Sequence, residues 1–167
     1  MALLEFYNGT GSDDRGRRIE DVWRFSHDEL EDIHDYIQWL FPLAERSAFN
    51  PGAPILDDAT IQRFRTDTTL RGSMERSLRL LLAFYGLEIA GVSIRRASNF
   101  AERSANWLMP GNHNFLRLTR ILKSLSLLGL GDRAVQLLDC LEEVYAANED
   151  TIGARTMGFW RRAAGQG

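Results

Sequence analysis

Apolar residues recur at the 3.6-residue period of an α-helix through most of the sequence, and this periodicity constrains the fold more than any other feature. In segment 113–129 the stripe is unbroken and stops at Gly129, a residue suited to a helix end. Its members are Leu118, Ile121, Leu122, Leu125 and Leu128. A second long stripe predicts a helix over 68–85, closed by Gly86. Because no convincing run of period-2 alternation accompanies these stripes, the sequence predicts an all-α fold.

Capping signals and proline set the ends of the other predicted helices. Ser26 and Glu29 form an S-x-x-E capping box, which predicts a helix over 26–41 that Pro42 ends.

Shorter helices are predicted downstream. Asp57 or Asp58 can cap one of them, a second is expected over 96–106, and Asp132 can cap another. A final amphipathic segment follows, for about seven helices in all. Residues 1–25 read as an irregular N-terminal arm. With no linker or repeat in the chain, a single compact multi-helix domain over 1–167 is predicted.

Composition excludes several classes of protein. The net charge of −3 offers no general attraction to nucleic acid, and the longest apolar run falls far short of a transmembrane segment. Cys140 is the single cysteine, so an internal disulfide and a thiolate metal cluster are both excluded. No segment resembles a signal peptide, and the expected location is the cytoplasm. Arginine supplies all basic residues except Lys123, which is typical of a GC-rich bacterial genome.

The segment "HDYIQWLFP" gathers polar and aromatic side chains on the predicted helix 26–41. On a helical wheel His34 and Gln38 lie along one edge of the apolar stripe, whereas Asp35 and Trp39 lie on nearly the opposite face. A tryptophan on that face either lines a cleft or packs beneath a neighbouring segment. Both alternatives remain open at this stage.

The segment "HNFLRLTRILKSL" places His113, Arg117, Arg120 and Ser124 in one row beside the leucine stripe. Basic side chains in the first turns oppose the helix macrodipole, so an anionic group is expected nearby. An external carboxylate or phosphate would fit, because the start of a helix presents free N–H groups. The alternative is internal pairing with acidic side chains of the first helix. These are Glu31, Asp32 and Asp35.

These motifs, with "LAFYG", "ASNF" and "NW" between them, resemble the conserved region of the opioid growth factor receptor in order and spacing over residues 6–130. The resemblance implies a helical, receptor-like binding domain without enzymatic activity, in a family named for binding the pentapeptide methionine-enkephalin. A single-domain, bacterial-type member is expected, for which an animal opioid peptide is an unsuitable ligand.

Two functions follow from the residues and the resemblance. The first is a binding domain for a small anionic or peptide ligand; the second is a protein-interaction or scaffold module in which the motif residues are purely structural. The predicted ligand-binding residues are His34, Asp35, Gln38, Trp39, His113, Asn114, Arg117 and Arg120. No catalytic residue, metal ligand or cofactor is predicted, because the histidines lack metal-ligand spacing and Cys140 has no activating neighbour.

Overall fold

The computed structural model describes residues 2–165 and divides the chain into two compact units, 1–80 and 81–167. We call them unit 1 and unit 2, and each is described by itself. The boundary falls inside the longest helix, α6. The single domain predicted for 1–167 stays a prediction.

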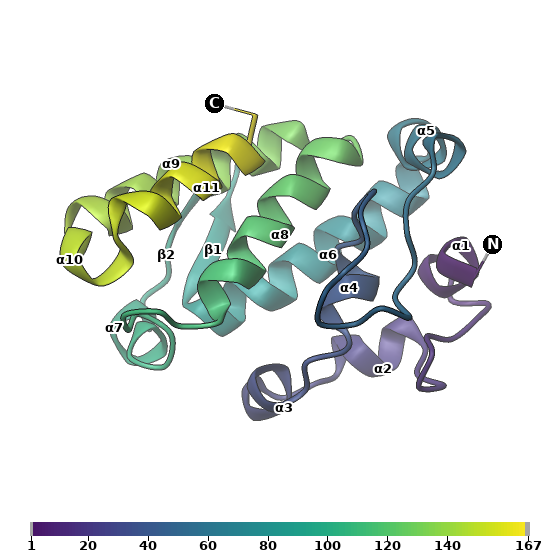
Figure 1. Cartoon of the computed structure of the whole chain (residues 1–167), viewed down its shortest axis with the longest axis horizontal. Helices are drawn as coiled ribbons and strands as arrows, with labels where there is room; N and C mark the ends of the chain where they lie inside the picture. Colours follow the sequence, from purple (N-terminus) through teal and green to yellow (C-terminus); the bar gives the residue numbers. More distant parts are fainter. Residues whose placement is uncertain (1, 166–167) are drawn as a thin grey trace. The chain divides into compact units, whose positions relative to one another are not determined.

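Unit 1 consists mainly of short helices and irregular segments (Figure 1). Its elements are α1 (Ala2–Tyr7), α2 (Ile19–Trp23), α3 (His27–Asp32), α4 (Ile37–Leu40), α5 (Asp58–Thr66) and most of α6 (Thr68–Tyr85). The loop after α4 carries a single parallel bridge between Leu43 and Ile55.

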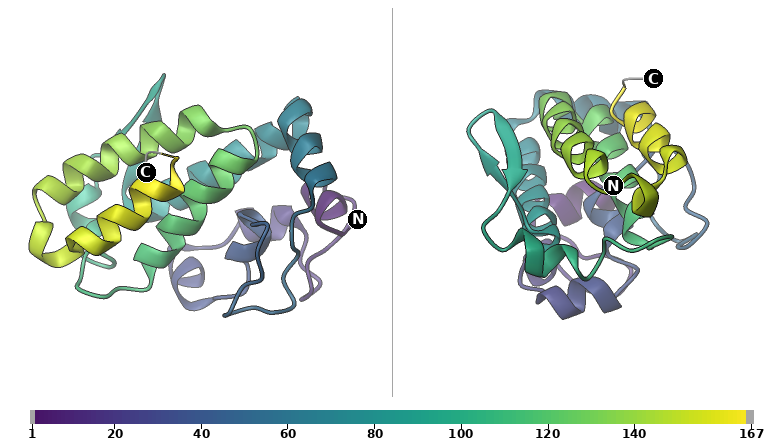
Figure 2. Two further views of the ribbon diagram at one scale, coloured as in Figure 1. Left: turned by 45° about the horizontal axis from the view of Figure 1, so that its top comes forward. Right: turned by 90° about the vertical axis from the view of Figure 1, so that its left-hand side faces the viewer.

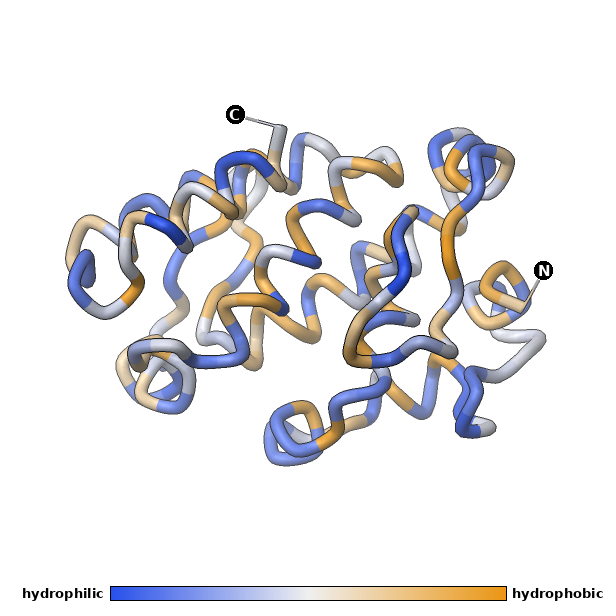
Figure 3. The backbone as a smooth tube through the Cα atoms, in the orientation of Figure 1, coloured by the Kyte–Doolittle hydropathy of each residue, from blue (hydrophilic) through white to orange (hydrophobic). Residues whose placement is uncertain are grey.

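Unit 2 contains the longer helices and a small sheet. Its elements are β1 (Leu87–Ala90), β2 (Ser93–Arg96), α7 (Phe100–Ser104), α8 (Asn114–Leu127), α9 (Gly131–Ala146), α10 (Glu149–Ile152) and α11 (Ala154–Ala163). Helix α9 packs against α8 and β2, and α11 packs against α8 and α9, as the two views of Figure 2 also show. Along α8 the hydropathy alternates between apolar and polar stretches in Figure 3, as expected of a helix with one buried face.

The predicted all-α class with about seven helices is wrong. Residues 2–165 form eleven helices and one two-stranded antiparallel sheet, so the fold is mostly helical with a hairpin. The hairpin pairs Leu87 with Arg96 and Ala90 with Ser93, which leaves a two-residue turn. Gly91 has a positive φ of 62° in that turn, a conformation that glycine adopts without steric cost. Each strand is only four residues long, too short for a clear alternating pattern.

The helix predicted over 96–106 is accordingly shortened. Its first residue lies in β2, and the helical part is α7, Phe100–Ser104.

The N-terminal arm predicted as irregular contains α1 and α2. Several of its apolar side chains are buried, among them Phe6, Tyr7, Ile19 and Val22. Helices this short cannot be stable alone, so contacts with the rest of unit 1 must hold them.

The helix predicted over 26–41 is two helices. The capping box forms as predicted, since Ser26 Oγ accepts from Glu29 N and Glu29 Oε2 accepts from Ser26 N. Helix α3 then ends at Asp32, and Ile33 is extended with φ −91° and ψ 127°. The wheel that placed Asp35 and Trp39 on one face therefore does not apply.

Candidate functional site

The break between α3 and α4 is stabilised by Tyr36. Its hydroxyl donates to the Leu30 carbonyl oxygen at 2.7 Å, near the end of α3, where helical partners are missing. A second tyrosine acts similarly, because the Tyr7 hydroxyl donates to the Leu40 carbonyl at the end of α4. Burial raises the pKa of Tyr7 well above its ordinary value, although a hydrogen bond with Ser77 acts in the opposite direction. Tyr7 is therefore a neutral donor at any physiological pH.

Asp35 belongs to an ion-pair network with the segment between α1 and α2. Its Oδ2 accepts from Arg15 Nε and its Oδ1 from Arg17 Nη2, both at 2.8 Å. Arg17 also donates from Nε to the buried carboxylate of Asp13 at 2.7 Å. Partial burial acts to raise the pKa of Asp35, but the hydrogen bonds and charges of Arg17 and Arg15 outweigh it and lower that pKa. For the Arg17 guanidinium, desolvation acts to lower the pKa, and the two aspartates raise it overall.

The other predicted residues of the first motif differ in exposure. His34 is exposed, whereas Gln38 and Trp39 are 4% and 5% exposed. The Trp39 ring meets Phe6 edge-on with 5.3 Å between centroids. Gln38 Oε1 and Trp39 Nε1 are both buried without a hydrogen-bond partner in the described part of the chain. This arrangement favours the packing alternative for Trp39.

The second motif lies in unit 2, at the start of α8. His113 is the exposed N-cap residue, while Asn114 is fully buried and Arg117 is 6% exposed. Asn114 Oδ1 accepts from the Tyr85 hydroxyl at 3.2 Å and from Arg117 Nη1 at 3.4 Å. Asn114 is thus the centre of a buried polar cluster in which Arg117 takes part.

Arg120 is half-buried, and Ser124 is fully buried one turn further along α8. The first turn of α8 carries no acidic residue, and the anionic group expected near it stays a prediction.

The eight predicted ligand-binding residues are divided between the units. His34, Asp35, Gln38 and Trp39 lie in unit 1, and His113, Asn114, Arg117 and Arg120 lie in unit 2. In unit 2 the structure brings Asn114 and Arg117 together, and in unit 1 Asp35 forms ion pairs with Arg15 and Arg17, which lie outside the predicted set. Their joint role in one ligand site stays a prediction.

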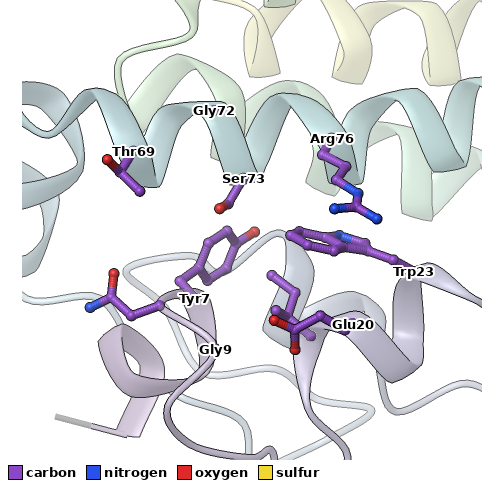
Figure 4. A pocket seen from close by; sticks show the side chains of 10 residues that line it. Tyr7, Gly9, Glu20, Trp23, Thr69, Gly72, Ser73 and Arg76 are labelled. Carbon is purple, nitrogen blue, oxygen red and sulfur yellow. The ribbon is translucent and has the colours of Figure 1, made fainter.

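A pocket of about 380 Å³ lies within unit 1, between the α1–α2 segment and α6 (Figure 4). Tyr7, Glu20 and Trp23 project from one side toward Thr69, Ser73 and Arg76 on the other. Asn8, Gly9, Ile19 and Gly72 complete the lining.

Trp23 forms one wall of the pocket and is held in place from two directions. Its Nε1 donates to Ser77 Oγ at 2.9 Å. The Arg76 guanidinium carbon lies 4.1 Å from the centre of its ring, which is a close cation–π contact. No ion pair between Arg76 and a carboxylate is present among the described residues. The pocket therefore contains a rigid aromatic surface with an unpaired cation above it.

Glu20 is the acidic group of the pocket. Its Oε2 is buried and has no hydrogen-bond partner in the described part of the chain. The backbone of Gly9 approaches so closely that a Cβ there would lie 2.6 Å from Glu20 Oε1, and Gly9 has a positive φ of 73°. A carboxylate so placed is costly to keep without a counter-charge.

Gly72 lies in the interior of α6 and lines the pocket. A glycine inside a helix costs roughly 0.5–1 kcal/mol relative to alanine. A Cβ at Gly72 would meet no atom within 4 Å, so close packing does not account for this glycine. At position 72 the pocket lining is therefore backbone alone.

Sequence reasoning missed this pocket because it treated 1–25 as an irregular arm. One signal was available, since a glycine stands in the middle of the strongly periodic stretch 68–85. The position of Glu20 and Trp23 opposite α6 carries no such local signal.

Two other features bear on the type of site. Among residues 2–165, no group of three or more His, Cys, Asp or Glu side chains is arranged to hold a metal ion. Within the same range, no helix is both long enough and apolar enough to cross a membrane.

Comparison with known proteins decides the family. The family model described as the opioid growth factor receptor (OGFr) conserved region matches residues 1–160. The chain belongs to this family. The resemblance seen over 6–130 is thereby confirmed and extended, whereas the bacterial origin stays a prediction.

Three matching relatives are animal proteins. The opioid growth factor receptor of Rattus norvegicus is 42% identical over 137 residues, covering 78% of this chain and 23% of the relative. That of Homo sapiens is 42% identical over 120 residues, 67% of this chain and 17% of the relative. Opioid growth factor receptor-like protein 1 of Mus musculus is 37% identical over 135 residues, 77% of this chain and 29% of the relative.

The matched region thus spans less than a third of the length of these relatives. No solved structure matches the chain.

Proposed function

We propose that the chain is a receptor-like binding domain for a small ligand, and that this ligand is a peptide rather than an anion. The receptor names of its relatives support a binding role. Catalysis forms no part of the proposal. The predicted cytoplasmic location is kept as a prediction.

The open pocket of unit 1 is the observation that carries this proposal. It combines a fixed tryptophan face, a carboxylate without a partner and an arginine without a paired acid. The Glu20 carboxylate disfavours an anionic ligand. A peptide offers an ammonium group, amide groups for the Asn8, Thr69 and Ser73 side chains, and apolar side chains for the aromatic wall.

The cost of Gly72 also supports binding at this place. A side chain at position 72 would enter open space, so no neighbouring atom requires a glycine at this position. Residues that sacrifice stability without a structural return are typical of functional sites.

A selection experiment tests the proposal. Random heptapeptides displayed with free N-termini are selected on the full chain, and synthetic copies of the enriched peptides are measured by calorimetry. Gly72→Leu should fill the pocket and weaken binding about tenfold or more, the loss of about 1.4 kcal/mol. Gly72→Ala is the matched control, because its methyl group adds helix propensity without filling the pocket, and binding should persist.

Two results would contradict the proposal. Enrichment of no peptide above background would remove the binding function itself. Equal binding by wild type and Gly72→Leu would show that the peptide site lies outside this pocket.

The second candidate is an interaction or scaffold module in which the two motifs serve only the fold. The burial of Gln38, Trp39, Asn114 and Arg117 favours it for these motif residues. Arg117→Ala should then destabilise the chain by about 3 kcal/mol, as removal of a buried charged group from its partners does. If the motif arginines instead bind ligand, Arg117→Ala with Arg120→Ala would abolish binding of a selected peptide while thermal unfolding stayed unchanged.

A further inference from the structure

We infer that the pocket of unit 1 selects a peptide by its free N-terminal ammonium group, with Glu20 as the receiving carboxylate. This inference rests on the peptide-binding function proposed above and names the part of the peptide that is recognised. It assigns Glu20, Trp23 and Arg76 to one site.

The Glu20 carboxylate lacks a counter-charge within residues 2–165. One of its oxygens is excluded from water and has no partner, while the side chain still lines an open pocket. Carboxylates removed from water are normally paired with a cation or with several N–H donors. Among the described residues no ion pair to Glu20 is formed, and Arg76 is held over the Trp23 ring instead. A ligand cation would supply the missing charge.

Gly9 lies directly beside the Glu20 carboxylate. A side chain there would collide with Glu20 Oε1, so glycine allows the carboxylate to lie directly against the backbone at the pocket wall. Gly72 adds no side chain to the α6 side of the same pocket. A peptide N-terminus, whose ammonium group is small, can therefore approach the carboxylate beside Gly9.

The donors on α6 distinguish a peptide N-terminus from other amines. Thr69, Ser73 and Arg76 project into the pocket opposite Glu20 and can donate to oxygen atoms (Figure 4). A peptide N-terminus carries carbonyl oxygens within a few bonds of its ammonium group. The ammonium group can therefore bind Glu20 while the carbonyl oxygens accept from the donors on α6. A lysine side chain carries its ammonium group on a four-carbon stem without acceptors. The combination therefore favours the N-terminus.

The test compares three defined peptides on the full chain. The probes are trialanine amide with a free amino terminus, its N-acetylated form, and acetyl-Ala-Lys-Ala amide. Binding is followed by NMR, through the backbone amides of Gly9 and Gly72 and the Trp23 indole N–H. The free-amine peptide should shift these signals at the lowest concentration, and its acetylated form should bind about tenfold or more weakly, as expected when a charge-assisted hydrogen bond is lost.

Charge-removing variants complete the test. Glu20→Gln keeps the shape of the side chain and should lower the affinity for the free-amine peptide about tenfold. Asp28→Asn is the matched control, because Asp28 is exposed on α3 outside the pocket and changes the net charge equally. Its affinity should equal that of the wild type.

Each contrary result has its own meaning. Equal binding of acetyl-Ala-Lys-Ala amide would show that the pocket recognises an ammonium group but does not select the peptide N-terminus. Equal binding of the acetylated peptide, or unchanged affinity in Glu20→Gln, would overturn ammonium recognition and leave the peptide-binding function standing. If neither the defined probes nor any selected heptapeptide bound, both proposals would fail.

Discussion

Unit 2 is organised around the leucine stripe of α8 and its packing with α9 and α11, whereas the short helices of unit 1 are joined by directional polar contacts. In unit 1 the tyrosine hydroxyls of Tyr7 and Tyr36 donate to carbonyls at the ends of α4 and α3. Arg17 links Asp13 with Asp35 between segments distant in sequence. Both units bury apolar side chains, and unit 1 in addition depends on hydrogen bonds and ion pairs between its short segments.

This difference predicts different sensitivities to substitution. Apolar packing is non-directional and spreads over many contacts, so a conservative change costs little. A buried hydrogen-bonded ion has few partners, and its removal leaves them unsatisfied. The same directional construction also shapes the pocket of unit 1.

The largest effect is expected from Asp13→Ala. The buried carboxylate accepts hydrogen bonds from the backbone N–H groups of Arg15 and Arg17 and from the Arg17 side chain. Its loss should destabilise unit 1 by about 3 kcal/mol. Residue-resolved hydrogen exchange should show protection falling in α1 and α2 more than in α8.

Arg15→Ala is the control for that change, because the exposed pair of Arg15 with Asp35 should contribute less than about 1 kcal/mol. Equal losses from the two variants would show that the Asp13 cluster does not hold unit 1 together.

A smaller effect is expected from acid. The pKa of Asp35 is lowered in the folded chain, so its contribution is present above the unfolded pKa of about 3.9 and is lost as the pH falls below about 4. In unit 2, hydrogen bonding to Arg161 likewise lowers the pKa of Glu142, but that pair is more exposed. Urea unfolding should therefore show an acid loss that Asp35→Asn reduces more than Glu142→Gln does. The reverse order would contradict the comparison.

Substitution of a mid-helix glycine by alanine, once in each unit, should change the free energy of unfolding by about 1 kcal/mol or less. Gly72→Ala should stabilise the chain by up to about 1 kcal/mol, since alanine is the better helix former and its methyl group meets open space. At Gly158 in α11 a Cβ would lie 3.3 Å from Arg162 Nη1, so part of the same gain is offset. Thermal unfolding of the two variants measures the difference, and a larger gain at Gly158 would be inconsistent with these surroundings.

Alkylation of Cys140 in α9 tests the packing of unit 2 without a substitution. Burial, with a lesser contribution from Glu143, raises the pKa of this thiol to about 11, although Arg96 acts to lower it. Alkylation at pH 8 should be slow and should speed up at denaturant concentrations that open unit 2. Rapid alkylation of the native chain would show that α9 is less tightly packed than described.

Local signals explain most of what could be predicted. The Ser26–Glu29 capping box, the Asp57 cap on Thr60 and the bounds of α6 followed from neighbouring residues. Gly86 ends its helix with a positive φ of 80°, as its position indicated. Asp132 was predicted as a cap but lies one residue inside α9, whose first residue is Gly131.

The candidate site was harder to predict. The motif residues were recognised as a family signature, but Gln38, Trp39, Asn114 and Arg117 are buried. Asp35 was assigned to a helix face that does not exist, and its partners are Arg15 and Arg17. The pocket residues Glu20, Trp23 and Arg76 were not singled out at all.

The sequence by itself determined the family, the long amphipathic helices and their caps, because periodicity and capping depend on residues within a few positions of one another. Only the tertiary structure decided the break after Asp32, the hairpin of β1 and β2, and the pocket beside Gly72. In unit 1 the deciding hydrogen bonds join residues such as Tyr7 with Leu40 and Trp23 with Ser77. Such contacts are specified by the folded chain as a whole, and no short stretch of sequence carries them.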